Sequence, residues 1–463
     1  QNAVILRVSR IEIPTWALFA IAIKIQSVIA QKISISCCAS QFIFQFVISA
    51  RASIVRIVKL TTTSTTLPMA PDAAPKPAEL GVELPINGAR GDGMYVHVPF
   101  CRHKCHYCDF YSFVDAQDRQ EVFVARMENE LATWARVQRG ELQTLFVGGG
   151  TPTMLRPELL DRMLSAIRGM LKWTAGAEWT VEANPETVSE AIAAVLSKHC
   201  VTRVSLGAQS FQPELLAALE RTHDPASVAR AVGRLRNAGI KGINLDLIYA
   251  VPGATIDLWR RDLVATLELN PEHMSCYGLM YESNTPLGVR HKRGEVTAIG
   301  EDLEVEMHEL AARMLGDAGY EHYEISNWAK PGHRCQHNIL YWNNCNWFAA
   351  GPAASGHVDG LRWRNVPRLS DWLETSGFAP VQDVERLDVD GQVGETFMMG
   401  LRLIDGMPGE RVQELLSKGA RATVRRIAIA KFRADGLLEE VRGQLRLTAR
   451  GRMLSSEVAI ALL

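Results

Sequence analysis

Short apolar runs alternate with longer amphipathic segments from residue 91 onward. The apolar runs are rich in Val, Ile and Leu, as buried strands are. They are Met94–Val98, Leu142–Val147, Trp179–Glu182, Arg203–Leu206, Ile243–Tyr249 and His273–Leu279. The segments between them repeat apolar residues at helical spacing. They are Glu121–Val137, Pro157–Leu171, Glu186–Ser197, Pro225–Ala238 and Thr255–Leu269. This alternation predicts βαβ units and a parallel sheet.

The six predicted strands lie within about 190 residues, which is too few for a closed eight-stranded barrel. The α/β pattern therefore predicts a partial (β/α)6 barrel that is open on one side. In such parallel sheets, ligands bind at the carboxyl ends of the strands. We expect the functional residues at that edge.

Two further regions follow the predicted core, which spans residues 91–326. Residues 327–369 are rich in Gly, Asn and Trp and predict a loop region. Residues 370–463 predict a separate C-terminal domain that is mainly helical and winged-helix-like. This domain is expected to contain helices at Val393–Gly400, Gly409–Leu416 and Ala422–Ala434 and a closing hairpin around Arg442 and Gly443.

Residues 1–68 differ in composition from the rest of the chain. They contain one acidic residue, Glu12, and no methionine, and the first methionine, Met69, opens a linker over residues 69–90. The segment is rich in Ile, Val, Ser, Thr and Ala, with scattered Arg and Lys. It could be a transit peptide, because such peptides are rich in Arg and Ser and poor in acidic residues. Its apolar run suits a membrane anchor poorly because Lys24 interrupts it. It also fits non-coding sequence translated ahead of a start at Met69, which is the interpretation we favour.

The composition narrows the class of protein. Hydrophobic residues make up 47% of the 463-residue chain and charged residues 22%, which allows sizeable cores and argues against disorder. The formal net charge of -1 gives no support for nucleic acid as a partner. Nine cysteines in a chain of this length do not make a disulfide scaffold, and three of them crowd into eight residues. We therefore expect a metal or redox site in a reducing compartment.

The three crowded cysteines are Cys101, Cys105 and Cys108, shortly after the first predicted strand. Thiolates are the ligands of iron–sulfur clusters, and three thiolates leave one iron of a [4Fe–4S] cluster without a protein ligand. Such an open position is where a small molecule can bind the metal, as in catalytic zinc sites. The main alternative is a structural zinc site with His103 or His106 as fourth ligand, although no second Cys/His pair follows at the usual spacing. Three merely buried cysteines are a weaker alternative beside so many charged residues.

The spacing Cys-x₃-Cys-x₂-Cys after a first strand resembles the signature of the radical S-adenosylmethionine (SAM) superfamily. The resemblance implies a [4Fe–4S] cluster whose open iron binds the amino and carboxylate groups of SAM. It also implies that reduction of the cluster cleaves SAM to a 5′-deoxyadenosyl radical. The predicted barrel would then be a partial (β/α)6 radical-SAM barrel.

Glycines and polar residues follow the other predicted strands. The run from Gly148 to Thr153 comes after the second strand, and its glycines would let the backbone approach a ligand closely. Glu182, Gln209 and Asp246 lie at the ends of the next strands. Each could by itself be a helix cap or a satisfied buried group, but three at successive strand ends favour a ligand pocket.

These segments resemble one subfamily, the oxygen-independent coproporphyrinogen III oxidases and the related heme chaperones of HemW type. The similarity runs from about Met94 to beyond Trp342 and continues more weakly to the C-terminus. The glycine run resembles the family's GGTP motif, which contacts the amino group of SAM. The resemblance implies that SAM is contacted by Tyr95, Gly149, Gly150, Thr151, Glu182, Gln209, Arg221 and Asp246.

Two motifs separate the oxidase from the chaperone. The oxidase carries a fourth cysteine two residues after the third, and this chain has Phe110 there, which resembles the chaperone branch. That branch also carries His-Asn-x-x-Tyr-Trp, which spans His337 to Trp342 here. His337 with its neighbouring aromatic rings suits heme, and Cys335 is a candidate second ligand. The alternative is that His337 and Trp342 only pin a loop against the barrel.

The sequence therefore predicts a heme chaperone that binds a [4Fe–4S] cluster, SAM and heme and delivers heme to haemoproteins. The recipient haemoprotein is expected to be membrane-bound, and the cluster is expected to need an electron donor. Radical oxidative decarboxylation of coproporphyrinogen is the alternative function. We expect a cytoplasmic protein, or an organellar one if residues 1–68 are a transit peptide.

Overall fold

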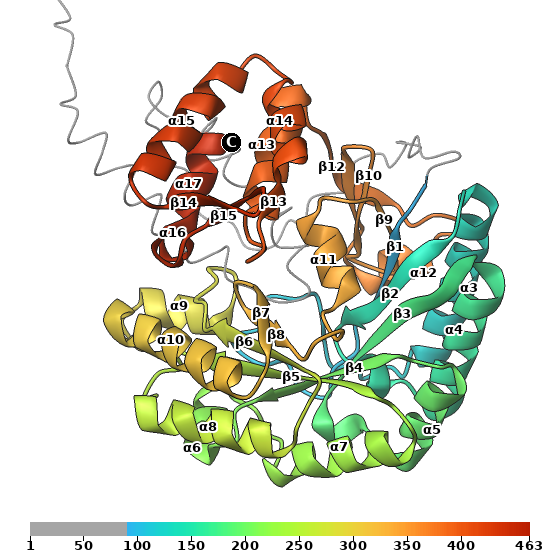
Figure 1. Cartoon of the computed structure of the whole chain (residues 1–463). Helices are drawn as coiled ribbons and strands as arrows, with labels where there is room; N and C mark the ends of the chain where they lie inside the picture. Colours follow the sequence, from blue (N-terminus) through green and yellow to red (C-terminus); the bar gives the residue numbers. More distant parts are fainter. Residues whose placement is uncertain (1–89) are drawn as a thin grey trace, which may run out of the picture.

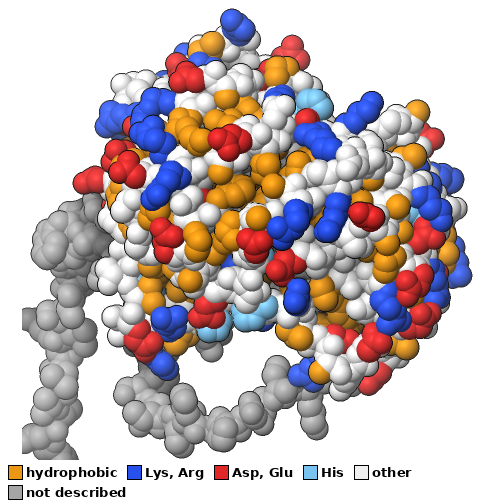
Figure 2. Space-filling view, turned by 90° about the horizontal axis from the view of Figure 1, so that it is seen from below, with side chains coloured by type: hydrophobic (Ala, Val, Ile, Leu, Met, Phe, Trp, Pro, Cys, Tyr) orange, Lys and Arg blue, Asp and Glu red, His pale blue; other side chains and the backbone are white. Residues whose placement is uncertain are grey.

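The structure is a computed structural model that describes residues 90–463. The predictions for residues 1–68, and for the linker up to residue 89, lie outside the described part. Within it, a large curved sheet flanked by helices carries a smaller C-terminal unit (Figure 1). Basic and acidic side chains are mixed on the face seen in Figure 2, in keeping with the net charge of -1. Every helix in the described residues is too short or too polar to span a bilayer.

The inner layer is the predicted parallel sheet, in which six strands lie side by side in chain order. These strands are β1 (Gly93–Val98), β2 (Leu142–Gly149), β3 (Trp173–Ala183), β4 (Arg203–Gln209), β5 (Gly242–Tyr249) and β6 (His273–Gly278). Most of their residues are buried, which explains why they read as apolar runs. The prediction of a partial (β/α)6 barrel is confirmed.

Helices cover the outer face of this sheet (Figure 1). They are α3 (Gln120–Val137), α4 (Pro157–Met170), α5 (Glu190–Lys198), α6 (Pro213–Ala218), α7 (Ala226–Asn237), α8 (Ile256–Glu268) and α10 (Glu301–Asp317), with α9 (Pro286–Lys292) preceding the last. In α4, Pro157 occupies the first turn, where its missing N–H has no partner to lose. The buried residues Leu160, Met163, Leu164 and Ile167 then recur at helical spacing on one face of α4.

The prediction that residues 327–369 form a loop region is wrong. They form β8 (Asn327–Ala329), α11 (Gln336–Trp342), β9 (Trp347–Ala350), β10 (Ser355–Val358) and β11 (Leu361–Asn365). Strand β9 pairs with β1 and β8 pairs with β6, so the sheet grows at both edges. With β7 (Glu321–Glu324) and β12 (Val381–Arg386), it reaches 12 strands. Strands this short show no clear period of two in the sequence. They form because they pair with the edges of the barrel sheet, which the sequence pattern does not reveal.

The C-terminal unit starts after β12 rather than at residue 370, because α12 (Leu369–Leu373) packs on α3 and β12 pairs with β11. Its helices are α13 (Val389–Gly400), α14 (Gly409–Leu416), α15 (Ala422–Ala434), α16 (Ala449–Met453) and α17 (Ser455–Leu462). Its small sheet contains β13 (Met407–Pro408), β14 (Leu438–Val441) and β15 (Gln444–Leu447). Arg442 and Gly443 both have positive φ, as a two-residue hairpin turn requires. The mainly helical unit with a hairpin at Arg442 and Gly443 is confirmed, but the hairpin does not close the unit, because α16 and α17 follow it.

Candidate metal and cofactor site

A cavity of about 210 Å³ lies at the carboxyl ends of the parallel strands, where ligands were expected. Its wall brings together most of the residues predicted from the sequence. These are Cys101, Cys105, Cys108, Gly149, Gly150, Thr151, Glu182, Gln209, Arg221 and Asp246. Tyr95 and His337 lie elsewhere.

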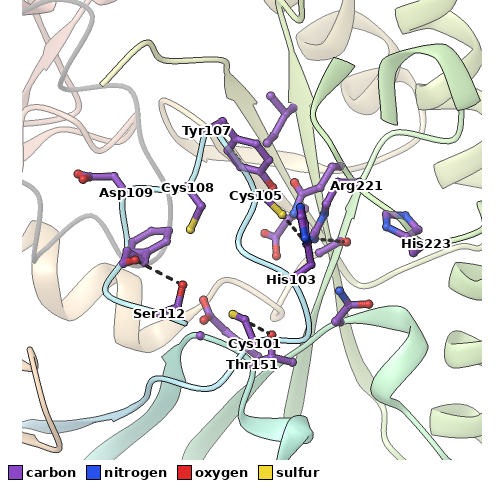
Figure 3. A pocket seen from close by; sticks show the side chains of 18 of the residues that line it. Cys101, His103, Cys105, Tyr107, Cys108, Asp109, Ser112, Thr151, Arg221 and His223 are labelled. Atoms are coloured by element: carbon purple, nitrogen blue, oxygen red, sulfur yellow. Dashed lines mark hydrogen bonds between the residues drawn. The ribbon is translucent and has the colours of Figure 1, made fainter. Parts of the chain in front are cut away.

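The three cysteines project from the loop that follows β1. Cys105 is buried, and Cys101 and Cys108 are half-buried. The backbone N–H of Cys108 donates to the carbonyl of Cys105 at 3.1 Å, which folds the loop back on itself. Figure 3 shows the three sulfur atoms around one open space. The loop therefore offers three thiols to a common ligand.

Each cysteine sulfur has a hydrogen-bonding neighbour. Thr151 Oγ1 lies 3.7 Å from Cys101 Sγ, and Arg221 Nη1 lies 3.6 Å from Cys105 Sγ (Figure 3). Lys104 Nζ lies 3.9 Å from Cys108 Sγ. Burial raises the pKa of the Cys108 thiol, and the Lys104 charge opposes that rise. Hydroxyl and cationic neighbours favour the thiolate, which is the form that binds iron.

The donor set fits an iron–sulfur cluster with one open iron, because one loop supplies three thiols and no fourth thiol among residues 90–463 lines the cavity. The zinc alternative required His103 or His106 as a ligand. His106 Nδ1 lies 2.6 Å from Glu220 Oε1, whereas His103 lines the cavity with the three cysteines. Within residues 90–463, no three His, Cys, Asp or Glu side chains are grouped to hold a single metal ion.

The glycine run lets the end of β2 lie close to the cysteine loop. Gly149 has a φ of +105°, and a Cβ there would come within 2.3 Å of the His97 ring. A Cβ on Gly150 would lie 2.7 Å from the carbonyl oxygen of Phe100. The Gly149 N–H donates to Glu182 Oε2 at 3.0 Å, which ties the run to β3. Only glycines allow this approach.

Asp246 and Arg221 place a carboxyl group and a guanidinium group in the cavity wall. Burial raises the pKa of Asp246, while hydrogen bonds from Ser205 at 2.7 Å and Asn244 at 2.8 Å stabilise its carboxylate. Burial alone would lower the pKa of Arg221, but Tyr107 and Cys105 raise it, so its guanidinium stays charged. Arg221 Nη2 donates to the carbonyl of Gly207 at 2.9 Å. The wall can therefore bind a ligand that carries both charges, as SAM does.

The cavity wall also contains residues that the sequence reasoning missed. Tyr277 lies at the end of β6, and His223 follows Arg221 by two residues. Burial lowers the pKa of His223 to about 4, with Arg221 adding to the effect, so its imidazole is neutral. Extending the strand-end rule to β6 would have identified Tyr277. No sequence pattern singled out His223.

Tyr95 acts on the cysteine loop through a neighbour rather than from the cavity. Its hydroxyl lies 3.0 Å from His97 Nδ1, and His97 Nε2 donates to the carbonyl of Tyr111 at 2.8 Å. Burial lowers the pKa of His97 to about 4, which keeps the ring neutral and able to accept from Tyr95. Tyr95 thus orients a histidine that holds the chain just beyond the cysteines.

His337 lies at the amino end of the strands, away from the cysteine loop. Its Nδ1 lies 2.7 Å from Thr144 Oγ1, and its Nε2 lies 2.8 Å from Tyr341 Oη. Thr144 pairs with Gly93, the first residue of β1, whereas the cysteines follow the last. The ring is fully buried, and burial lowers its pKa to about 3. This position supports the packing alternative, and the role in heme ligation stays a prediction.

The rest of the His-Asn-x-x-Tyr-Trp motif joins the barrel to the C-terminal unit. Glu178 on β3 accepts from the backbone N–H of His337 at 3.0 Å and so caps α11. Trp342 is buried against Met398 and Met399 of α13. Its ring also lies 4.5 Å from the guanidinium carbon of Arg402. Cys335 is buried near Glu178, 3.5 Å from its Oε1.

Comparison with protein families gives two matches. The Radical SAM superfamily matches residues 95–263, which cover β1 to most of α8. The HemN C-terminal domain matches residues 387–454, which begin directly after β12. Most of the cavity wall lies within the first match, and the part at the end of β6, which includes Tyr277, lies beyond it.

Similar proteins extend over most of the chain. A heme chaperone HemW from Mycobacterium tuberculosis (strain H37Rv) is 38% identical over 395 residues, which cover 84% of this chain and 98% of that protein. A heme chaperone HemW from Escherichia coli (strain K12) is 33% identical over 78% of this chain and 95% of that protein. Among solved structures, coproporphyrinogen III oxidase (HemN) from Escherichia coli, a radical SAM enzyme, has a TM-score of 0.70 at 19% identity. The match covers 81% of this chain and 90% of that one. At that identity, it shows the fold.

Proposed function

The chain belongs to the heme chaperone HemW family of the radical SAM superfamily, and on that basis we propose that it delivers heme to haemoproteins. In this proposal, the cysteine loop binds a [4Fe–4S] cluster and the cavity binds SAM. Heme binds near the His-Asn-x-x-Tyr-Trp motif. The relatives that support the assignment match nearly their whole length.

The observation that carries the choice of a chaperone is Phe110. This residue stands where the oxidase branch has a further cysteine, and it lines the cavity. Its carbonyl accepts a hydrogen bond from Lys104, so its backbone is part of the cysteine loop. A phenyl ring at this place has no acid–base or ligating chemistry to offer a substrate.

The residues of the cavity would bind SAM by its charges. A bound cluster supplies an iron with an open position for the amino and carboxylate groups of SAM. Arg221 would pair with the carboxylate, as guanidinium groups commonly do. Glu182 and Asp246 would face the positive amino and sulfonium groups. Gln209 would donate and accept hydrogen bonds at the nucleoside.

The heme step is proposed to use His337 as axial ligand. Both ring nitrogens of His337 are hydrogen-bonded, so iron ligation would replace the contact with Thr144 or the one with Tyr341. Aromatic rings already surround the site, since Phe146 stacks on the imidazole with 5.3 Å between ring centroids. Heme binding would therefore need α11 to move away from the barrel.

A transfer assay tests this function. The reconstituted protein is loaded with heme and mixed with the apo form of a membrane-bound b-type haemoprotein, and the heme spectrum of the recipient is followed. We expect transfer to be faster than from serum albumin that carries the same heme concentration. Transfer that is equal to or slower than from albumin would refute the proposal.

A pair of variants tests whether His337 binds heme. His337→Ala is expected to weaken heme binding at least about tenfold in a titration, a loss of about 1.4 kcal/mol. His357 is a matched control, because it is buried and its Nδ1 donates to the carbonyl of Cys345 at 2.9 Å. His357→Ala should bind heme as the wild type does. Equal binding by both variants would remove His337 from the heme site.

Coproporphyrinogen oxidation is the second candidate, and the fold shared with the Escherichia coli oxidase favours it. Incubation with coproporphyrinogen, SAM and a reductant distinguishes the two functions. We expect no protoporphyrinogen at a catalytic rate. Catalytic formation of that product would make the oxidase the correct function.

The proposal also implies partners and a location. Reduction of the cluster needs an electron donor, and delivery needs a recipient haemoprotein, which we propose to be membrane-bound. Free thiols such as the three in the cavity persist in a reducing compartment. We therefore propose a cytoplasmic location.

A further inference from the structure

Two of the three sulfur contacts in the cavity come from cations, but the two cations differ in origin. Arg221 follows β4 and α6 and reaches Cys105 from across the barrel. Lys104 belongs to the cysteine loop itself, between the first and second cysteines. Its Nζ lies 3.9 Å from Cys108 Sγ. Lys104 was not among the predicted site residues.

The ammonium of Lys104 is held in place by two oxygens. It donates to the carbonyl of Phe110 and, at 3.1 Å, to Ser112 Oγ. A lysine has three N–H donors, and the contact with Cys108 takes the third. The side chain is half-buried, so water screens its charge only in part. A flexible residue is thus fixed with its charge against one sulfur.

We propose that Lys104 raises the reduction potential of the cluster by placing a positive charge and a hydrogen bond against the Cys108 thiolate. One-electron reduction adds negative charge to the cluster and its sulfurs. A fixed cation stabilises the reduced form more than the oxidised form, and hydrogen bonds to sulfur act in the same direction. This role rests on the cluster of the proposed function and does not depend on heme.

A purely structural role for Lys104 makes a different prediction. If Lys104 only braces the loop through Phe110 and Ser112, its replacement would change how much cluster the protein holds. It would leave the potential of the cluster that is held unchanged. Iron content and midpoint potential therefore separate the two roles.

The test is a redox titration of reconstituted protein, followed by the electron paramagnetic resonance signal of the reduced cluster. We expect Lys104→Gln to lower the equilibrium constant for reduction about tenfold, which is about 59 mV in a one-electron midpoint potential. Lys104→Arg keeps the charge and should stay near the wild type. Lys104→Gln with full iron and an unchanged potential would overturn the proposal.

Arg102 provides the matched control. It lies on the same loop, its side chain is 67% exposed, and it pairs with Glu186 at 3.1 Å rather than with a sulfur. Arg102→Gln should shift the potential much less than Lys104→Gln, and equal shifts would contradict a specific contact. If Lys104→Gln holds less iron, the midpoint potential is still read from the molecules that keep a cluster, because only they give the resonance signal. A lower potential in that fraction supports the proposal, and an unchanged one refutes it.

An iron-free wild type would refute the cluster itself, and with it the proposed function. Full iron with no effect of Lys104 would refute only this inference.

Discussion

The two ends of the barrel strands use polar residues in opposite ways. At the carboxyl end, Asp246 and Arg221 face a cavity beside three thiols. At the amino end, Thr144 and His337 bond to each other inside a packed core closed by α11. One end keeps charged groups next to open space, and the other buries neutral groups in satisfied pairs. A polar residue in a strand of this barrel therefore indicates a ligand site when it lies at the carboxyl end of the strand, and packing when it lies at the amino end.

The difference follows from the residues at each end. Gly149 and Gly150 let the end of β2 lie against His97 and the cysteine loop, because any side chain there would collide with them. At the amino end, Phe146, Tyr341 and Trp347 fill the space with large rings. Burial then keeps His337 neutral. The account predicts that changes at the first end alter ligands and that changes at the second alter stability.

The largest expected effect is at the carboxyl end. Cys105→Ala should reduce bound iron from about four per chain to nearly none, because two thiolates cannot hold a [4Fe–4S] cluster. Iron and sulfide analysis with the visible spectrum measures this. Cys276→Ala is the control, since Cys276 is a buried cysteine of β6 outside the cavity. Iron loss in the control, or retained iron in Cys105→Ala, would break the comparison.

The next effect is at the amino end. Trp342→Ala should lower the free energy of unfolding by about 3–5 kcal/mol, because it empties a buried site under α13. Urea unfolding measures this loss, and the folded protein should still bind about four irons. A normal stability with lost iron would place Trp342 in the cluster site and contradict the account.

A smaller effect depends on pH. The pKa of His337 lies near 3, below its ordinary value of 6.5, so the unfolded chain binds a proton that the folded chain does not. The stabilisation is complete above about pH 6.5 and falls with pH by up to about 1.4 kcal/mol per unit. His337→Gln has no imidazole and therefore lacks this pH-dependent stabilisation. The difference in unfolding free energy between the two proteins should shrink from pH 6.5 to 4, and a constant difference would contradict burial of a neutral imidazole.

The smallest expected effect is in ligand affinity. Asp246→Asn keeps the shape beside Ser205 and Asn244 and removes a charge from the cavity. SAM affinity should fall about tenfold, or about 1.4 kcal/mol, in calorimetric titration of the reconstituted protein. The unfolding free energy should change little. Unchanged affinity with lower stability would make Asp246 a packing residue like those at the amino end.

Much of the barrel and its cavity could be predicted because the signals are local. The cysteines sit in one loop, and strand-end residues such as Glu182 and Asp246 meet wherever parallel strands lie side by side. The amino end could not be predicted this way. The place of His337 depends on α11 folding into the barrel and on Glu178, which is 159 residues away in the chain. The place of Tyr95 could not be predicted for a related reason, since strand alternation alone does not show that its hydroxyl lies against His97 rather than in the cavity wall.

The most direct test of the account is Mössbauer spectroscopy of protein reconstituted with ⁵⁷Fe, measured with and without SAM. Three thiolates around one cluster leave a single iron open, so SAM should change the signal of about one iron in four. The other irons should keep their spectra. Four equivalent irons that do not respond to SAM would contradict the account.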